Sequence, residues 1–312
     1  MVMSQRSGYR EHSGPWPAVL SRYDPDDVLR ELAGHGAVVV RGPAATREAF
    51  VELTDGLMES LPHHSVATRE REVVAAESNL ATVNRGMDAI PLHRESSFLP
   101  TQPDVLAFYC EHPPAEGGQT TLCDGVRLLA ELPDDVRGFA EEEAFTWRFR
   151  MPFERWSVAL GTSSKEMASQ RIGQLMARFA PLATYDYRFD GEHLDGTYQA
   201  PLVLPTFWGR RAAFANSLLQ YYYREPGPLV ARHLHHAAIS GGRQFPAGML
   251  AVIRDCAEGL ISEVAWQAGD TVLVDNSHVM HGRRPVGDPA RRVLVRLGNY
   301  LPEASAARAA RH

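Results

Sequence analysis

The sequence predicts an α+β fold with a mainly antiparallel β core. Two stretches that lie far apart, about residues 84–125 and 262–302, contain short strand-like runs broken by Pro and Gly. The chain between them, about residues 126–260, has mostly helical patterns and predicts a large helical insertion. Because no long linker separates these parts, we expect a single domain over residues 1–312.

The core strands are predicted from apolar runs rich in β-branched residues, which favour extended chain. These runs lie at residues 105–110, 119–123, 270–274 and 292–297. Helices of the insertion are expected at residues 126–131, 165–179, 228–239 and 247–258.

The N-terminal part predicts an αβ layer over one face of the core. The Asp-Pro-Asp-Asp segment at residues 24–27 is a plausible cap for a helix over residues 28–34. Residues 37–40, between two glycines, predict a short buried strand. A second helix is expected over about residues 47–60, where the apolar side chains share one face.

Composition argues against several classes of protein. The 312 residues carry a net charge of −6 and no basic block, which argues against a nucleic-acid partner. The chain contains no run of about 18 apolar residues, so no membrane helix is predicted. The opening residues lack the apolar segment of a secretory signal, so a cytoplasmic location is expected. Residues 1–15 and 305–312 are expected to be disordered.

The chain has 13 histidines and 3 cysteines. Three distant cysteines provide neither a disulfide framework nor a CxxC zinc site. A metal site in this chain would therefore use imidazole and carboxylate ligands.

The first candidate ligands are His93 and Glu95. In extended chain these two side chains point to the same face, roughly 6.6 Å apart, and can converge on one ion. An HxE pair alone is a weak signal because it occurs by chance in many chains. A polar strand end is the alternative.

A second histidine segment follows the predicted strand at residues 270–274. Asp275 and Asn276 predict a turn, and either His278 or His281 can supply a third ligand. Two histidines and one carboxylate form a facial triad that leaves three positions open on an octahedral metal, which suits non-haem Fe(II).

Arg292 and Arg296 form the third feature, since they share one face of a predicted strand. An Arg inside a barrel is costly unless a carboxylate offsets its desolvation by bidentate pairing. The alternative is that both face solvent.

The order and spacing of these motifs resemble the taurine dioxygenase/clavaminate synthase-like superfamily of Fe(II)/2-oxoglutarate dioxygenases. The HxE form is closest to the clavaminate synthase-like members. The motifs cover about residues 84–302 and include a Gly-Gly-x-Thr at residues 117–120. The resemblance implies that the β core is a double-stranded β-helix (jelly roll, cupin-like). It also implies Fe(II), 2-oxoglutarate and O2 as cofactor and co-substrates.

The same resemblance implies roles for individual residues. His93, Glu95 and His281 match the metal ligands, because the distal histidine lies six residues after the Asp of the Asp-Asn turn. Thr120 and Arg292 match the residues that hold the far carboxylate of 2-oxoglutarate.

Substrate contacts are expected from three further residues. Arg296 matches a position that often meets an acidic group on the substrate, and Ser96 and Phe98 follow the metal motif directly. Halogenating relatives replace the carboxylate ligand with Gly or Ala, so the presence of Glu95 argues against halogenation.

The implied reaction is oxidative decarboxylation of 2-oxoglutarate to succinate, coupled to C–H hydroxylation or to desaturation or cyclisation. The expected substrate is a small amino-acid-like molecule of specialised metabolism, either free or tethered to a carrier protein. Two alternatives from other classes are a non-catalytic jelly-roll protein that binds a ligand or regulates a pathway, and a zinc hydrolase with the same triad. No membrane partner is expected.

Overall fold

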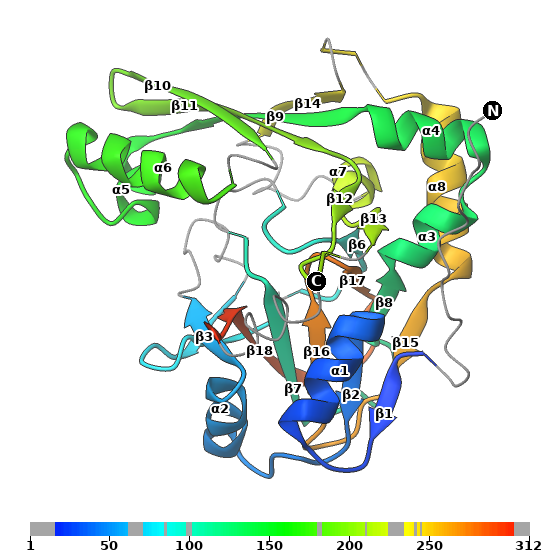
Figure 1. Ribbon diagram of the computed structural model, residues 1–312. Coiled ribbons are helices and arrows are strands. Elements are labelled where there is room, and N and C mark those ends of the chain that lie inside the picture. The colour runs from blue at the N-terminus through cyan, green and yellow to red at the C-terminus, as the bar shows by residue number, and fades with distance from the viewer. Residues whose placement is uncertain are drawn as a thin grey trace.

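The computed structural model describes most of the chain, as residues 16–61, 71–83, 86–97, 102–179, 183–209, 211–223, 234–239, 242–243 and 245–302. Residues 1–15 and 305–312, which are expected to be disordered, lie outside the described part of the chain. Figure 1 shows a β core with two N-terminal helices against it and a separate sheet, which includes β9, β10 and β11, at the opposite end of the molecule.

Twelve strands within the described residues form the two sheets of the core. They are β1 (Ala18–Leu20), β2 (Ala37–Val40), β3 (Met58–Leu61), β4 (Val73–Ala75), β5 (Leu80–Thr82), β6 (Ile90–His93), β7 (Val105–His112), β8 (Thr120–Asp124), β15 (Ser262–Val264), β16 (Thr271–Asp275), β17 (Val279–Arg283) and β18 (Arg292–Tyr300). The larger sheet has the order β1-β2-β16-β7-β18-β5-β4, with β3 also paired to β18, and the smaller has the order β15-β8-β17-β6. This arrangement confirms the predicted double-stranded β-helix.

The space between the two sheets is apolar. Phe108 and Val295 from the larger sheet pack in one cluster with Leu122 and Val279 from the smaller sheet. Because side chains alternate along a strand, every second residue of these strands faces this interior. The functional side chains described below occupy the same faces.

The predicted N-terminal layer covers the outer face of the larger sheet. Helix α1 (Pro25–His35) is capped by the Asp24 carboxylate, which accepts from two backbone N–H groups of the first turn. Helix α2 (Arg47–Asp55) packs Phe50 into the same cluster as Val28 of α1. The expected second helix is too long, because the chain from Met58 leaves α2 and pairs as β3 with the end of β18.

The insertion contains both helices and a sheet. Its helices are α3 (Gly125–Glu131), α4 (Asp134–Glu142), α5 (Phe153–Ala159), α6 (Lys165–Phe179), α7 (Leu218–Tyr223) and α8 (Ala247–Gly259). Strands β9 (Ala144–Met151), β10 (Thr184–Asp190), β11 (His193–Pro201) and β14 (Leu234–Ile239) form an antiparallel sheet, and β12 (Leu204–Pro205) and β13 (Ala212–Ala213) form a small hairpin. The expectation of a largely helical insertion is therefore wrong for the segments that form the sheet of β9, β10, β11 and β14.

The prediction of a helix at residues 228–239 is wrong over its described part, Leu234–Ile239, which is β14. Pairing with β9 along its length supplies hydrogen bonds that outweigh a weak local helical preference. The expectation of a single domain stays a prediction. Among the described residues, no helix is both long and apolar enough to cross a membrane.

Candidate active site

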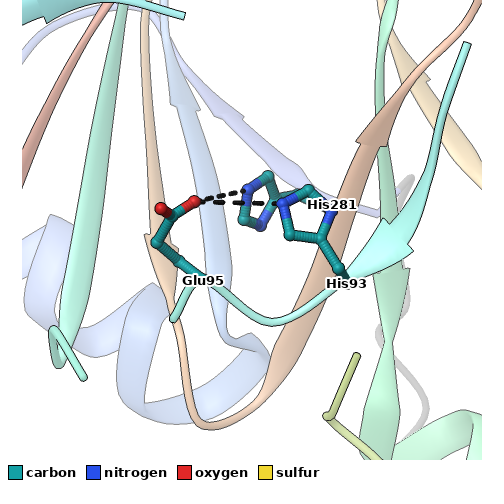
Figure 2. Close-up of side chains that lie close together, drawn as sticks. All are labelled: His93, Glu95 and His281. Carbon is teal, nitrogen blue, oxygen red and sulfur yellow. Dashed lines mark ion pairs between the residues drawn. The ribbon is translucent and has the colours of Figure 1, made fainter. Parts of the chain in front are cut away.

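Three side chains converge in the interior of the β core, as Figure 2 shows. Nε2 of His93 and Nε2 of His281 lie 3.9 Å and 3.6 Å from Oε2 of Glu95. The centroids of the two imidazole rings are 4.2 Å apart. All three potential ligand atoms lie within 4.8 Å of one another, so a single ion can contact all of them.

Strand pairing brings the two histidines together. His93 is the last residue of β6, and it lies directly opposite His281 of β17 in the antiparallel ladder. On its other side His281 pairs with Leu122, and its ring packs 5.5 Å from the ring of Phe108. Residues from segments almost 190 positions apart therefore share one face of one sheet.

Glu95 reaches the cluster differently from the way the sequence suggests. Strand β6 ends at His93, so Glu95 lies in the turn that follows rather than on the same strand. The next residue, Ser96, has a φ of 55°, in the left-handed region that non-glycine residues seldom occupy. The turn folds the carboxylate back toward the imidazoles.

His93 and Glu95 have the protonation states that metal binding needs. Burial and the neighbouring His281 lower the pKa of His93 to about 3, so its imidazole is neutral. Nδ1 of His93 lies 3.0 Å from the Pro91 carbonyl, which can only accept, so Nδ1 carries the proton and Nε2 is left as a ligand. Burial favours a raised pKa for Glu95, but Arg71, His281 and His93 together outweigh burial and hold that pKa below its usual value.

His278 does not join the cluster. Its Nε2 lies 3.0 Å from the Asp124 carboxylate, and both side chains are buried. The same carboxylate accepts from the backbone N–H groups of Val126 and Arg127 and so caps α3. His278 therefore holds two parts of the fold together, and of the two candidates only His281 lies at the cluster.

A second group of polar side chains lies farther along the same strands. Thr120 of β8 pairs with Arg283 of β17, two residues from His281 on the same strand face. By strand rise this separates Arg283 from His281 by roughly 6.7 Å. The indole Nε1 of Trp266 donates to Oγ1 of Thr120 over 3.2 Å, and both side chains are buried.

Arg291 adds a second cation to this group. Its side-chain stem lies against the Gly117-Gly118 turn, and a Cβ placed on Gly118 would be 2.7 Å from its Cδ. Burial and the positive charge of Arg283 lower the pKa of Arg291 to about 10. Within the described part of the chain, its Nε is buried without a hydrogen-bond partner.

Arg292 does not face this interior, and its predicted position is wrong. Its side chain is 40% exposed, and its Nε lies 2.6 Å from a carboxylate oxygen of Glu111, which also pairs with Arg47. The β7–β18 ladder is irregular here, because Arg292 lies opposite His112 while the next residue lies opposite Cys110. The extra residue of this bulge, Glu111, lies on β7 and does not alter the count from His281. Arg292 faces outward because it precedes the interior Val293 by one residue on β18.

Arg296 is buried, but on the outer face of the larger sheet. Its Nε donates to the Ser78 carbonyl over 2.8 Å, and its Nη1 donates to the Val51 carbonyl over 3.0 Å and to Thr54. Its Nη2 donates to Asp55 over 2.7 Å. The guanidinium thus holds the end of α2, and neither predicted alternative, a substrate contact or a solvent-facing side chain, is correct.

The remaining substrate candidates are less defined. Ser96 is half-buried in the turn beside Glu95, and its predicted contact with substrate stays a prediction. Phe98 lies outside the described residues.

Sequence reasoning missed four residues near the site. Arg283 was detectable, because it follows His281 by two residues on a strand and so shares its face. Arg291 was detectable in the same way, because it precedes the interior Val293 by two residues. Arg71, whose Nη2 lies 3.0 Å from Oε2 of Glu95, belongs to no recognised motif and carried no signal. The side chain of Asn276 bonds to the backbone of Glu95, a contact that spacing does not reveal.

Comparison with known proteins identifies the family of this chain. The sequence model described as "Taurine catabolism dioxygenase TauD, TfdA family" matches residues 5–297. A clavaminate synthase-like protein of Arabidopsis thaliana is 28% identical over 293 residues, which cover 87% of this chain and 83% of that protein. The dapdiamide synthesis protein DdaC of Enterobacter agglomerans is 23% identical over 299 residues, covering 88% of this chain and 85% of DdaC.

Solved structures agree on the fold. PvcB from Pseudomonas aeruginosa superimposes with a TM-score of 0.55 at 15% identity, covering 92% of this chain and 84% of PvcB. A second structure of PvcB, described as an Fe, alpha-ketoglutarate dependent oxygenase from an isonitrile synthetic pathway, gives a TM-score of 0.51 at 16% identity over 90% of this chain and 81% of PvcB.

The donor set fits the metal that such proteins use. Two imidazoles and one carboxylate leave open positions on Fe(II), as a co-substrate and O2 require. The family match spans almost the whole chain. This protein therefore belongs to the taurine catabolism dioxygenase TauD, TfdA family and is an Fe(II)- and 2-oxoglutarate-dependent oxygenase.

Proposed function

We propose that this enzyme couples decarboxylation of 2-oxoglutarate to succinate with C–H hydroxylation of a small amino-acid-like substrate. The convergence of His93, Glu95 and His281 within 4.8 Å carries the proposal, with these three residues as the iron ligands. Bound iron supplies the activation of O2, while the protein binds and orients the reactants and excludes water. Desaturation or cyclisation would use the same residues.

The far carboxylate of 2-oxoglutarate is proposed to bind at Thr120 and Arg291. The buried guanidinium of Arg291 can donate charge-assisted hydrogen bonds, and an anion would offset its desolvation. Arg283 adds positive charge at the same end, two residues from the ligand His281. That spacing suits a short dicarboxylate which also reaches the metal.

The hydrogen bond from Trp266 leaves the Thr120 hydroxyl free to act as a donor. An indole N–H can only donate, so Thr120 accepts at its oxygen. The single hydroxyl proton of Thr120 is then available for another acceptor. A carboxylate oxygen of the co-substrate is such an acceptor.

The substrate class rests on different support. DdaC is named for dapdiamide synthesis, and PvcB is described as part of an isonitrile synthetic pathway, which favours a role in specialised metabolism. With Arg296 engaged elsewhere, Arg71 is the cation beside the cluster that is placed to meet an acidic group. Ser96 and Phe98 stay candidates for further contacts. The substrate is proposed to be free or carrier-bound.

A succinate-release screen tests this function. Wild-type enzyme is supplied with Fe(II), ascorbate and 2-oxoglutarate, and is offered free amino acids and the same groups loaded on carrier proteins. We expect succinate formation with at least one member, and none with His281→Ala. No succinate with any member, together with no visible charge-transfer band on anaerobic addition of Fe(II) and 2-oxoglutarate, would contradict the proposal.

A further inference from the structure

The turn between β16 and β17 contacts the turn that carries Glu95. The side chain of Asn276, which is fully buried, makes this contact. Its Oδ1 accepts from the backbone N–H of Glu95 over 2.9 Å. Its Nδ2 donates to the backbone carbonyl of Glu95 over 3.1 Å and to that of Pro103 over 2.9 Å. One amide therefore binds both backbone groups of a candidate metal ligand.

Glu95 needs such a partner because the β ladder does not reach it. Strand β6 ends at His93, and the left-handed conformation of Ser96 follows immediately. Between these two points, Asn276 takes the place of a neighbouring strand for Glu95. A single side chain thus binds both backbone groups of the residue from which the carboxylate projects.

The position of Asn276 in the chain makes this contact relevant to the metal. Asn276 lies at the start of the β16–β17 connection, and His281 lies on β17 five residues later. The backbone N–H of Asn276 also donates to the Asp104 carbonyl over 2.9 Å, which anchors the turn itself. The same hairpin therefore supplies one candidate ligand and sets the backbone of another.

We propose that Asn276 is a positioning residue that holds the Glu95 carboxylate in register with the two imidazoles. The proposal rests on the proposed function, in that the cluster binds a divalent ion. The hydrogen bonds of the Asn276 side chain go to backbone groups of Glu95 and Pro103, not to a ligand atom of the cluster. Residues that orient metal ligands typically change metal affinity about 10–100-fold when they are replaced.

Asn276→Asp is the sharpest variant. It keeps the size of the side chain and one acceptor for the Glu95 N–H, but it loses both N–H donors and sets a carboxylate against two carbonyl oxygens. Asn276→Ser removes the clamp without adding charge. Asn79→Asp is the matched control, because Asn79 also donates through Nδ2, to Ser60, but does so away from the cluster.

The test is titration of each full-length, metal-free protein with Mn²⁺, followed by electron paramagnetic resonance. We expect about 10–100-fold weaker Mn²⁺ binding for Asn276→Asp and Asn276→Ser, and affinity within about twofold of wild type for Asn79→Asp. Two measurements separate positioning from general loss of structure. At saturating Co²⁺, the visible spectrum of the Asn276 variants should change, and hydrogen exchange at Glu95 should accelerate.

The outcomes distinguish the possible failures. If wild type binds Mn²⁺ and a folded Asn276 variant binds it equally well, Asn276 has no positioning role. If both Asn276 variants fail to fold, the residue is structural and the proposal is also wrong. If wild type itself does not bind Mn²⁺, the metal cluster of the proposed function fails. Mn²⁺ binding without succinate formation would contradict the reaction and leave the role of Asn276 intact.

Discussion

The two ends of the site are held by different kinds of backbone. At the metal end, His93 and His281 lie directly opposite each other on two paired strands, although the register of the β6–β17 ladder shifts beyond this pair. At the carboxylate end, Arg291 lies in the loop before β18, its stem lies against the Gly117-Gly118 turn, and it is two residues from the interior Val293. Residue spacing is informative where strand pairing fixes two residues directly, and it misleads by one residue across the loop between β17 and β18.

The largest expected effect is at the metal end, in the contrast between His281→Ala and His278→Ala. Loss of His281, or of His93, removes one of three ligands, so Fe(II) binding and succinate formation should fall below detection. His278→Ala should keep substantial turnover. It should nevertheless lower the free energy of unfolding by about 1–3 kcal/mol, because the buried Asp124 carboxylate loses one of its hydrogen-bond partners. Metal titration and denaturant unfolding check this, and equal loss of Fe(II) binding in both variants would contradict it.

The next effect is at the carboxylate end, between two adjacent arginines. Arg291→Ala should raise the KM for 2-oxoglutarate about 10–150-fold, the equivalent of losing about 1.5–3 kcal/mol of charge-assisted hydrogen bonding. Arg292→Ala removes an exposed ion pair with Glu111 and should leave that KM within about threefold. Steady-state kinetics at saturating substrate measures both. The opposite ranking would return the anchor to Arg292.

A smaller effect is expected at Thr120. Thr120→Val removes a neutral hydrogen bond and should raise the KM for 2-oxoglutarate about 2–13-fold. Thr120→Ser keeps the hydroxyl and should restore most of the affinity. The same kinetic assay measures both variants, and a Thr120→Val enzyme with unchanged KM would show that this hydroxyl does not contact the co-substrate.

The smallest effect on catalysis is expected at Arg296, even though it lies on β18 as Arg292 does. Arg296→Met should leave the KM for 2-oxoglutarate unchanged. It should destabilise the fold, at about 1–3 kcal/mol for each buried acceptor that loses its donor, such as the Val51 carbonyl. Thermal unfolding and kinetics on the same preparation test this. A raised KM in a variant of unchanged stability would place Arg296 at the site after all.

The core of the fold was predictable because its strands are apolar and regular. The two stretches of strands at residues 84–125 and 262–302 pair as the alternating pattern suggests, and α1 begins after its Asp24 cap. The insertion was less predictable. Residues 234–239 are a strand because β9 lies beside them, and no local pattern indicates that neighbour. A sheet made of such long-range pairs depends on contacts that a sequence window does not contain.

The sequence by itself determined the chemistry of the site. The types and order of His93, Glu95, Thr120 and His281 point to an Fe(II)- and 2-oxoglutarate-dependent oxygenase, and the family match agrees. Ligand identity depends on side-chain chemistry, which a sequence states directly. Only the tertiary structure decided which arginine faces inward. It also revealed that the Asn276 amide holds the backbone of Glu95. Those features depend on the β17–β18 loop and on the turn that carries Glu95, whose backbone geometry arises only when distant segments pack together.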